Sequence, residues 1–291
     1  MDKNYKELIF KILKIVISLL LCVGAAVSML GAVALNVARD YLQSEPFKTQ
    51  VTETDLATVK FSVAGQTVTV NEYVKKTITE YLEENMPYAS YFAGVAVEKV
   101  VSSQIVNDAV KGEVFDLVDF YLNSDAKAAK ERLKDGEDLA EKDFDIKSAK
   151  TVEEAVKMCA HTFIIANIEK TIKMPSDRVI VLLSEQTVTK LIIISCVLLI
   201  LLIAVNFRTP FNSLLWGAGS SLILGIAIKI VQGKFESMNE GTTDLVGYVF
   251  LKPLADTYSA NAMGAFIAAA VLIAVFVAIA FAFNKLNKPQ E

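Results

Sequence analysis

The sequence LIIISCVLLILLIAV (Leu191–Val205), followed by NFRTP (206–210) and FNSLLWGAGSSLILGIAIKIV (Phe211–Val231), decides the fold. The first apolar run has no charge, and the second carries only Lys229, near its far end. Two apolar runs separated by so short a polar break cannot end in water on opposite sides of a membrane. We therefore predict two membrane spans joined by a tight turn. The charge-free part of the first run covers only about 22 Å, so we expect this span to include Thr187–Lys190, with Lys190 reaching the headgroups.

The composition favours membrane spans combined with one water-exposed domain. Of 291 residues, 53% are hydrophobic, yet 21% are charged, which is a mixture atypical of a single soluble globule. The formal net charge is -4, and the excess acid lies between Arg39 and Lys190. An acidic domain without a polybasic stretch argues against nucleic acid as a partner.

Two more apolar runs predict a span on each side of this hairpin. Ile15–Asn36 is apolar or small throughout and is about 33 Å long as a helix, enough to cross a bilayer. Ala262–Phe283 is the fourth run. Ala32-Val33-Ala34 has the small-x-small form of a signal-peptide cleavage site, which is the alternative for the first run. Because the apolar run is long for a signal peptide, we favour an uncleaved anchor.

The positive charges beside the spans predict their orientation. The first tail carries four lysines, the hairpin turn carries Arg208 and the last tail carries Lys285 and Lys288. These segments share one side, which we expect to be cytoplasmic, and this places the insert outside the cytoplasm. The predicted order is a tail at 1–14, a span at 15–37, the insert at 38–186, a span at 187–206, a turn at 207–210, a span at 211–231, a loop at 232–260, a span at 261–284 and a tail at 285–291.

The insert is predicted to be mostly helical with one small hairpin. Thr58–Val70 alternates apolar and polar residues around Gly65-Gln66, which is typical of two short strands. A helix is expected from Asn71, and a helical pattern continues after Pro87 to about Asn123. Further along we expect a solvated helix at 124–134 and a loop at 135–150. The next helix is expected to begin at the capping box 151–154 and to end at Pro175, and Ser176-Asp177 is expected to cap the last one. The predicted fold class is thus a mainly α membrane protein, with four transmembrane helices and a mostly helical extracytoplasmic domain between spans 1 and 2.

Small residues recur every four positions in three of the predicted spans, where they would let another helix approach closely. The predicted helix-packing residues are Gly24 and Ser28 in the first span, Ser213, Gly217, Ser221 and Gly225 in the third, and Ala270, Ala274 and Ala278 in the fourth. Packing among the four helices of one chain explains these stripes. Self-association of the chain is the alternative.

No pattern in the sequence predicts a catalytic, cofactor or metal site. The spans contain no Asp, Glu or His, although proton- and ion-coupled transporters usually need an ionisable group at depth. His161, the single histidine, lies in an apolar helical segment and is expected in or beside the core. The acidic clusters are Glu113, Asp116 and Asp119, and Asp143 with Asp145; we interpret both as solvated faces, with cation binding as the alternative. Cys159 is alone in the insert, so no disulfide is expected there.

The predicted topology resembles that of claudins, connexins and the FtsX family of bacterial division proteins. In each, one span is followed by a large loop and then by three closely spaced spans. Their motifs are absent, because the insert has no Trp and one Cys, and because 206–212 is shorter than the FtsX connector. The chain is more similar to uncharacterised four-span membrane proteins of Gram-positive bacteria, through Tyr73-Val74 to Glu84 after a hairpin and Arg208-Thr209-Pro210 to Trp216-Gly217. This resemblance implies a bacterial plasma membrane and brings no activity with it.

These observations favour a non-enzymatic envelope protein whose extracytoplasmic domain binds a partner, ligand or surface. The expected partners are the lipid bilayer and either a second copy of the chain or another envelope protein. The alternative is an oligomeric pore or channel, in which the small-residue stripes would be subunit contacts.

Overall fold

The fold is described from a computed structural model, which covers residues 3–63, 66–85, 90–135, 146–207, 209–241, 249 and 252–286. The chain divides into two compact units. The first, which we call the span unit, comprises residues 1–37, 185–234 and 255–291. The second, the insert unit, comprises residues 38–184 and 235–254. The second unit therefore contains the predicted insert together with part of the predicted loop between the third and fourth spans.

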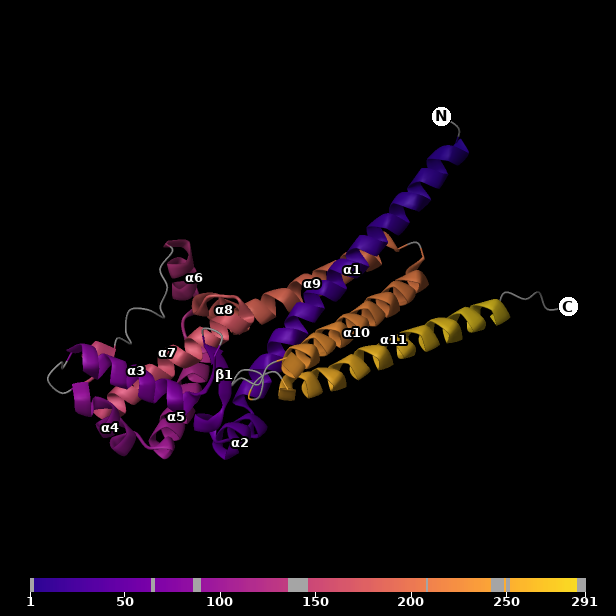
Figure 1. The fold of residues 1–291 in the computed structure, drawn as a ribbon. Helices are drawn as coiled ribbons and strands as arrows, with labels where there is room; N and C mark the ends of the chain where they lie inside the picture. Colours follow the sequence, from indigo (N-terminus) through magenta and orange to yellow (C-terminus); the bar gives the residue numbers. More distant parts are fainter. Residues whose placement is uncertain are drawn as a thin grey trace. The chain divides into compact units, whose positions relative to one another are not determined.

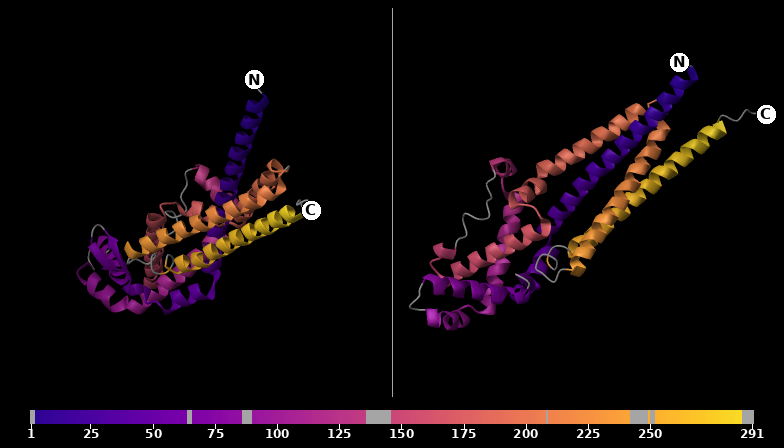
Figure 2. Two further views of the ribbon diagram at one scale, coloured as in Figure 1. Left: turned by 90° about the vertical axis from the view of Figure 1, so that its right-hand side faces the viewer. Right: turned by 45° about the horizontal axis from the view of Figure 1, so that its top comes forward.

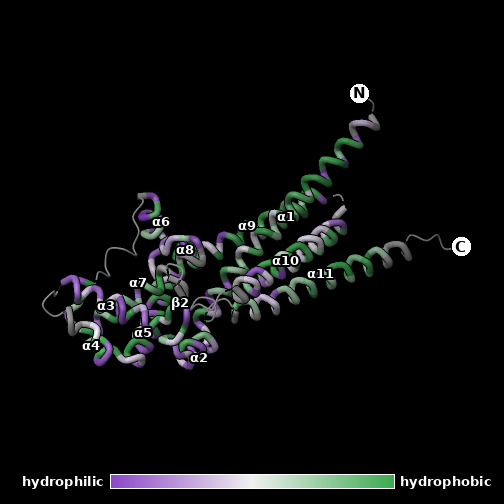
Figure 3. Tube along the Cα trace, viewed as in Figure 1, coloured by the Kyte–Doolittle hydropathy of each residue, from purple (hydrophilic) through white to green (hydrophobic). Residues whose placement is uncertain are grey.

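Four long helices supply the span unit: α1 (Lys3–Gln43, whose end from Ala38 belongs to the insert unit), α9 (Glu185–Val205), α10 (Pro210–Gly241) and α11 (Lys252–Leu286). Each contains a stretch long and apolar enough to cross a membrane, and these stretches dominate the hydropathy colouring in Figure 3. The coarse prediction of a mainly helical, multi-pass membrane protein with a small two-stranded sheet is confirmed for the described residues.

Small polar side chains join the helices of the span unit. Ser195 Oγ on α9 donates a hydrogen bond to the carbonyl of Ala25 on α1 (3.1 Å), and Asn206 Nδ2 donates to Ser18 Oγ (3.0 Å). These pairs run in opposite directions along the sequence, so α1 and α9 are antiparallel. Ser220 Oγ on α10 donates to the carbonyl of Cys22 (3.2 Å). Because lipid offers no hydrogen bonds, such contacts between helices satisfy polar groups that would otherwise be costly in a membrane.

The insert unit is helical except for one hairpin. Its elements are α2 (Glu45–Glu53), the 3-10 turn η1 (Leu56–Thr58), β1 (Lys60–Val63), β2 (Gln66–Thr69), α3 (Val70–Asn85), α4 (Ser90–Val100), α5 (Ser103–Asn123), α6 (Ala126–Asp135), the 3-10 turn η2 (Ile146–Ser148), α7 (Val152–Ile172) and α8 (Ser176–Leu183). The strands pair antiparallel, with Lys60 opposite Thr69 and Val63 opposite Gln66, as the alternating pattern predicted. Figure 1 labels most of these elements and Figure 2 shows them from two further sides.

The core of the insert unit forms around α5. Val106, Val110, Val114 and Leu117 recur at helical spacing on this helix and are buried. Facing elements add Phe47 and Val51 from α2, Val70, Val74 and Ile78 from α3, and Val156, Phe163 and Ile164 from α7. The rings of Phe61, Tyr73 and Phe163 meet with centroids 4.3–5.7 Å apart and fix the hairpin against α3 and α7.

Two stretches differ from the sequence prediction. The helical pattern between 90 and 123 is divided into α4 and α5, because Ser102 leaves the helical conformation and its Oγ caps α5 by accepting from the backbone N–H of Ile105 (3.2 Å). In the predicted loop at 232–260, α10 instead continues to Gly241 and α11 begins at Lys252. Polar residues such as Gln232 and Glu236 are good helix formers, so the helices extend beyond their apolar parts. Most of the predicted loop at 135–150 lies outside the described residues.

Candidate functional site

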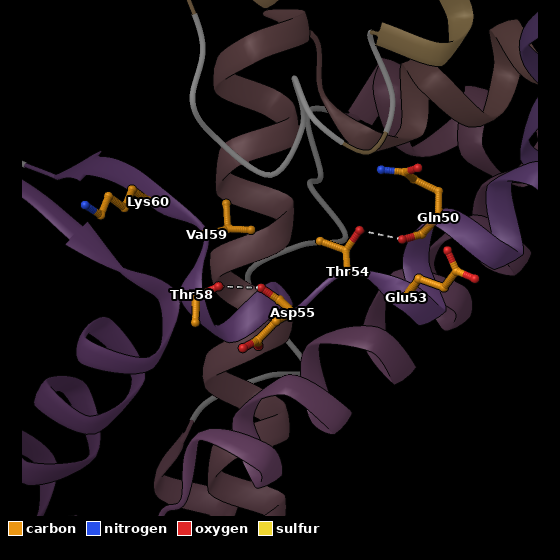
Figure 4. A pocket seen from close by; sticks show the side chains of 7 residues that line it. All are labelled: Gln50, Glu53, Thr54, Asp55, Thr58, Val59 and Lys60. Atoms are coloured by element: carbon orange, nitrogen blue, oxygen red, sulfur yellow. Dashed lines mark hydrogen bonds between the residues drawn. The ribbon is translucent and has the colours of Figure 1, made fainter.

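An open pocket lies on the insert unit where α2 ends and β1 begins, and we call it the α2–β1 pocket. Its volume is about 630 Å³, and it is lined by Gln50, Glu53, Thr54, Asp55, Thr58, Val59 and Lys60. Figure 4 shows these side chains along the end of α2, the turn η1, the start of β1 and the residues that connect them. Six of the seven lining side chains are polar or charged, so the pocket is suited to a polar ligand.

Hydrogen bonds hold the backbone that forms this pocket. Thr54 Oγ1 donates to the carbonyl of Gln50 (2.6 Å), and Thr58 Oγ1 donates to the carbonyl of Asp55 (2.8 Å). Below the pocket, Leu56 is fully buried and its N–H donates to the side chain of Asn107 on α5 (2.7 Å).

A second contact to α5 comes from Lys111, whose Nζ donates to the carbonyl of Thr52 (2.6 Å). Because α5 holds the chain at Thr52, near the end of α2, and at Leu56, where η1 begins, the shape of the pocket is set before any ligand arrives. A preformed shape lowers the entropic cost of binding.

No pattern in the sequence singles out this pocket. The available signal was the polar run Thr52-Glu53-Thr54-Asp55 directly before the hairpin. Such a run is also typical of an ordinary surface loop, and only the contacts with Asn107 and Lys111, more than fifty residues away, make it a defined pocket.

The acidic cluster on α5 is not the uniformly solvated face that we predicted. Asp116 and Asp119 are exposed, but Glu113 is only 6% exposed. Glu113 Oε2 lies 2.8 Å from Nδ1 of His161 on α7, and Lys157 Nζ lies 3.9 Å from Glu113 Oε1. The physical reason is that Glu113 faces α7, where its carboxyl group has the imidazole of His161 within hydrogen-bond distance and the ammonium group of Lys157 nearby. This contact joins two core helices of the unit.

Ser176 and Asp177 have a different role from the predicted helix cap. The N-cap position of α8 is Pro175, without a side-chain hydrogen bond, and Ser176 Oγ is 3.0 Å from the hydroxyl of Tyr121. Asp177 is 1% exposed and accepts from Arg132 Nη2 (2.8 Å) and Nε (3.1 Å). The fork of the guanidinium matches the two carboxylate oxygens, so this pair fastens α6 to α8.

Cys159 lies in the core of the insert unit. Burial raises the pKa of its thiol to about 12, so the reactive thiolate is scarce at neutral pH. Cys159 therefore packs in the core of the insert unit, mainly as the neutral thiol.

The predicted helix-packing residues occupy different environments within the span unit. A Cβ on Gly24 would lie 3.2 Å from a methyl group of Leu198, one on Gly217 would lie 3.6 Å from Leu272, and one on Gly225 would lie 2.7 Å from the ring of Phe266. Ser28 Oγ donates to the carbonyl of Gly24 within α1 (2.9 Å), and Ser213 and Ser221 are half-buried. On α11, Ala270, Ala274 and Ala278 are exposed, whereas Ala262, Ala265 and Ala269 are buried.

Among the described residues, no group of three or more His, Cys, Asp and Glu side chains is arranged to hold a metal ion. The predicted cluster of Asp143 and Asp145 lies outside these residues. Comparison of the chain with protein families, with curated proteins and with solved structures finds no match.

Proposed function

We propose that this chain is a non-enzymatic membrane protein whose insert unit binds a polar segment of a partner protein through the α2–β1 pocket. The observation that carries the proposal is the pocket itself, which is concave, polar and held in shape by Asn107 and Lys111. Four helices of sufficient length and hydropathy support an anchoring role for the rest of the chain.

The chemistry of the pocket favours a polypeptide over a drug-sized molecule as its ligand. Small-molecule sites are usually enclosed and mostly apolar, whereas this pocket is open, and Glu53, Asp55 and Lys60 bring three charged groups to its lining. Glu53 and Asp55 carry two negative charges against one positive charge on Lys60. A partner segment that contains a lysine or arginine beside hydroxyl or amide groups fits this balance of charges.

In the proposed arrangement the insert unit faces away from the cytoplasm of a bacterial cell. The lysines of the first and last tails, together with Arg208 in the short turn, support a cytoplasmic location for those segments. The partner is then another envelope protein or a second copy of this chain.

Site-specific photocrosslinking in living cells tests the proposal. A photoreactive phenylalanine analogue replaces Thr58 in the pocket or, as the control, Lys130 on the exposed side of α6 in the same unit. We expect a discrete crosslinked product from position 58 and none from position 130. Reversal of charge by Glu53→Lys with Asp55→Lys should remove that product while the amount of protein in the membrane is unchanged. Equal crosslinking from both positions, or a product that survives the charge reversal, would refute binding at this pocket.

An oligomeric pore is a second candidate, favoured by one observation. Ala270, Ala274 and Ala278 lie on an exposed side of α11, where a helix of another copy could approach closely. Mass measurement of the detergent-solubilised chain distinguishes the candidates, since a strict monomer rules out the pore.

A further inference from the structure

The first turns of α1 extend beyond the hairpin that joins α9 to α10. Lys14 Nζ donates to Thr209 Oγ1 (3.0 Å), so residue 14 is level with the turn between these helices. From Tyr5 to Lys14 the helix rises about 14 Å further. Figures 1 and 2 both show the N-terminal end of α1 projecting past that turn within the span unit.

This projecting segment has two chemically different sides. At 100° per residue, Leu8, Ile9, Ile12 and Leu13 share one side of the helix, and each is more than 40% exposed. Phe10, which is 75% exposed, lies at the edge of this side, between Leu13 and Lys14. Glu7, Lys11 and Lys14 lie on the opposite side, where Glu7 and Lys11 form an ion pair (3.1 Å). The sequence adds Lys3 and Lys6 in the preceding turns.

The apolar side continues a surface that already belongs to the membrane. Val16, Leu19, Leu20, Val23 and Val27 follow at the same helical spacing along α1 and are exposed, whereas Ser18 and Cys22 on the other side face α9 and α10. A single apolar stripe therefore runs along the lipid-facing side of α1 and past the end of the hairpin. In water this extension would be unfavourable, at about 25 cal/mol for each Å² exposed.

We infer that Tyr5–Leu13 is a binding surface for anionic phospholipid headgroups, with its apolar side against the membrane and Lys11 toward the lipid phosphates. A spanning helix longer than the hydrocarbon core tilts, and tilting inclines the projecting turns toward the bilayer surface. A helical segment with an apolar side opposite a lysine-bearing side is the type that binds membrane interfaces. This surface requires only the four spans and is independent of the α2–β1 pocket.

Thiol labelling of the full chain in vesicles tests the inference. Ile9→Cys places the thiol on the apolar side, and Glu7→Cys places it on the polar side of the same turn. Each variant is reconstituted in vesicles of phosphatidylcholine alone or mixed with phosphatidylglycerol. It is then treated with a water-soluble maleimide, and labelling is quantified at the level of peptides so that the native cysteines do not interfere. The ratio of the two sites cancels differences in the orientation of the chain, since both lie on one side of the membrane.

We expect slower labelling at position 9 than at position 7 in the anionic vesicles and a smaller difference in the neutral ones. Lys11→Gln should reduce the protection of position 9 about fivefold, because one lysine near an anionic surface contributes that factor. Lys130→Gln, on the exposed side of α6, is the matched control and should have no effect. Equal labelling rates at positions 7 and 9 would overturn the inference. Protection of position 9 that is the same in anionic and neutral vesicles would also overturn it. Protection of position 9 that increases with the protein-to-lipid ratio would overturn it as well, because a second copy of the chain would then shield this position.

Discussion

At the scale of single residues, the insert unit depends on a few charged side chains whose partners the sequence alone does not identify. Asp177 is almost completely buried and has the guanidinium of Arg132 as its counter-charge. Arg132→Ala removes that partner and leaves a carboxylate in the core, so we expect a loss of about 3–5 kcal/mol in the free energy of unfolding of this unit. Thermal unfolding of the solubilised chain measures the loss.

The neighbouring lysine supplies the control for this prediction. Lys130 lies on the same helix, α6, but is exposed, so Lys130→Ala should change the unfolding free energy by no more than about 0.5 kcal/mol. Similar destabilisation by both substitutions would mean that α6 depends on its helix propensity and not on the ion pair.

At the scale of elements, the turn from β2 into α3 depends on a reciprocal pair of hydrogen bonds. The N–H of Glu72 donates to Thr69 Oγ1 (3.1 Å), and the N–H of Thr69 donates to Glu72 Oε2 (2.7 Å), which is a complete capping box. Thr69→Ala should therefore cost about 1 kcal/mol of stability, whereas Thr67→Ala, two residues earlier and exposed, should cost less.

The same capping box predicts a dependence of stability on pH. Hydrogen bonds from Thr69 lower the pKa of Glu72 below its ordinary value. The capping contribution is therefore fully present above the unfolded pKa of about 4.3 and is lost as the pH falls through the lower, folded pKa. Glu72→Gln should remove this component of the acid destabilisation, and Glu83→Gln, exposed on the same helix, should leave it in place. Melting temperatures between neutral and acidic pH measure the difference, and identical profiles for the two variants would contradict the assignment.

In the span unit, Gly225 is the glycine of α10 at which an added Cβ would lie nearest to α11 among the described residues. A Cβ at Gly225 would lie 2.7 Å from Cε1 of Phe266, while a Cβ at Gly233 on the same helix would meet nothing within 4 Å. Gly225→Val should thus force the two helices apart and cost about 1–3 kcal/mol, and Gly233→Val should cost much less. The thermal stability of the solubilised chain is the measurement. Rescue of Gly225→Val by Phe266→Ala would show that the ring is the obstacle.

The helices and strands that are determined by residues within their own segment could be predicted from the sequence. The apolar length of α9 and the alternation of Thr58–Val70 each determine an element without help from distant residues. Thr69-Val70-Asn71-Glu72 has the same capping form as Thr151–Glu154, yet only the second was recognised in the sequence. The break at Ser102 and the polar end of α10 were not predicted. Hydropathy indicates burial or contact with lipid, so it does not show that a helix continues into polar residues.

At the scale of the whole molecule, what the sequence could not provide is the set of contacts between residues far apart in the chain. The α2–β1 pocket needs Asn107 and Lys111 to hold a loop that precedes them by more than fifty residues. Likewise, the carboxyl group of Glu113 on α5 has its hydrogen-bond partner, His161, on α7. Periodicity along one segment identifies which side of a helix is apolar. Where a polar residue such as Glu113 lies on that side, periodicity does not identify the distant polar group that will pair with it.

The proposed topology leads to the last prediction, because four spans return the chain to the side on which it began. Alkaline phosphatase fused after Leu286 or at the turn near Thr209 should be inactive, and the same enzyme inserted in the insert unit after Lys134 should be active, since it folds only outside the cytoplasm. Green fluorescent protein at the same positions should give the opposite pattern and serves as the control. Arg208→Glu together with Lys11→Glu and Lys14→Glu weakens the positive bias that we propose fixes this orientation, so a part of the molecules should then invert. An active phosphatase at Thr209 in the unaltered chain would place the hairpin turn outside and would refute the cytoplasmic assignment of both tails.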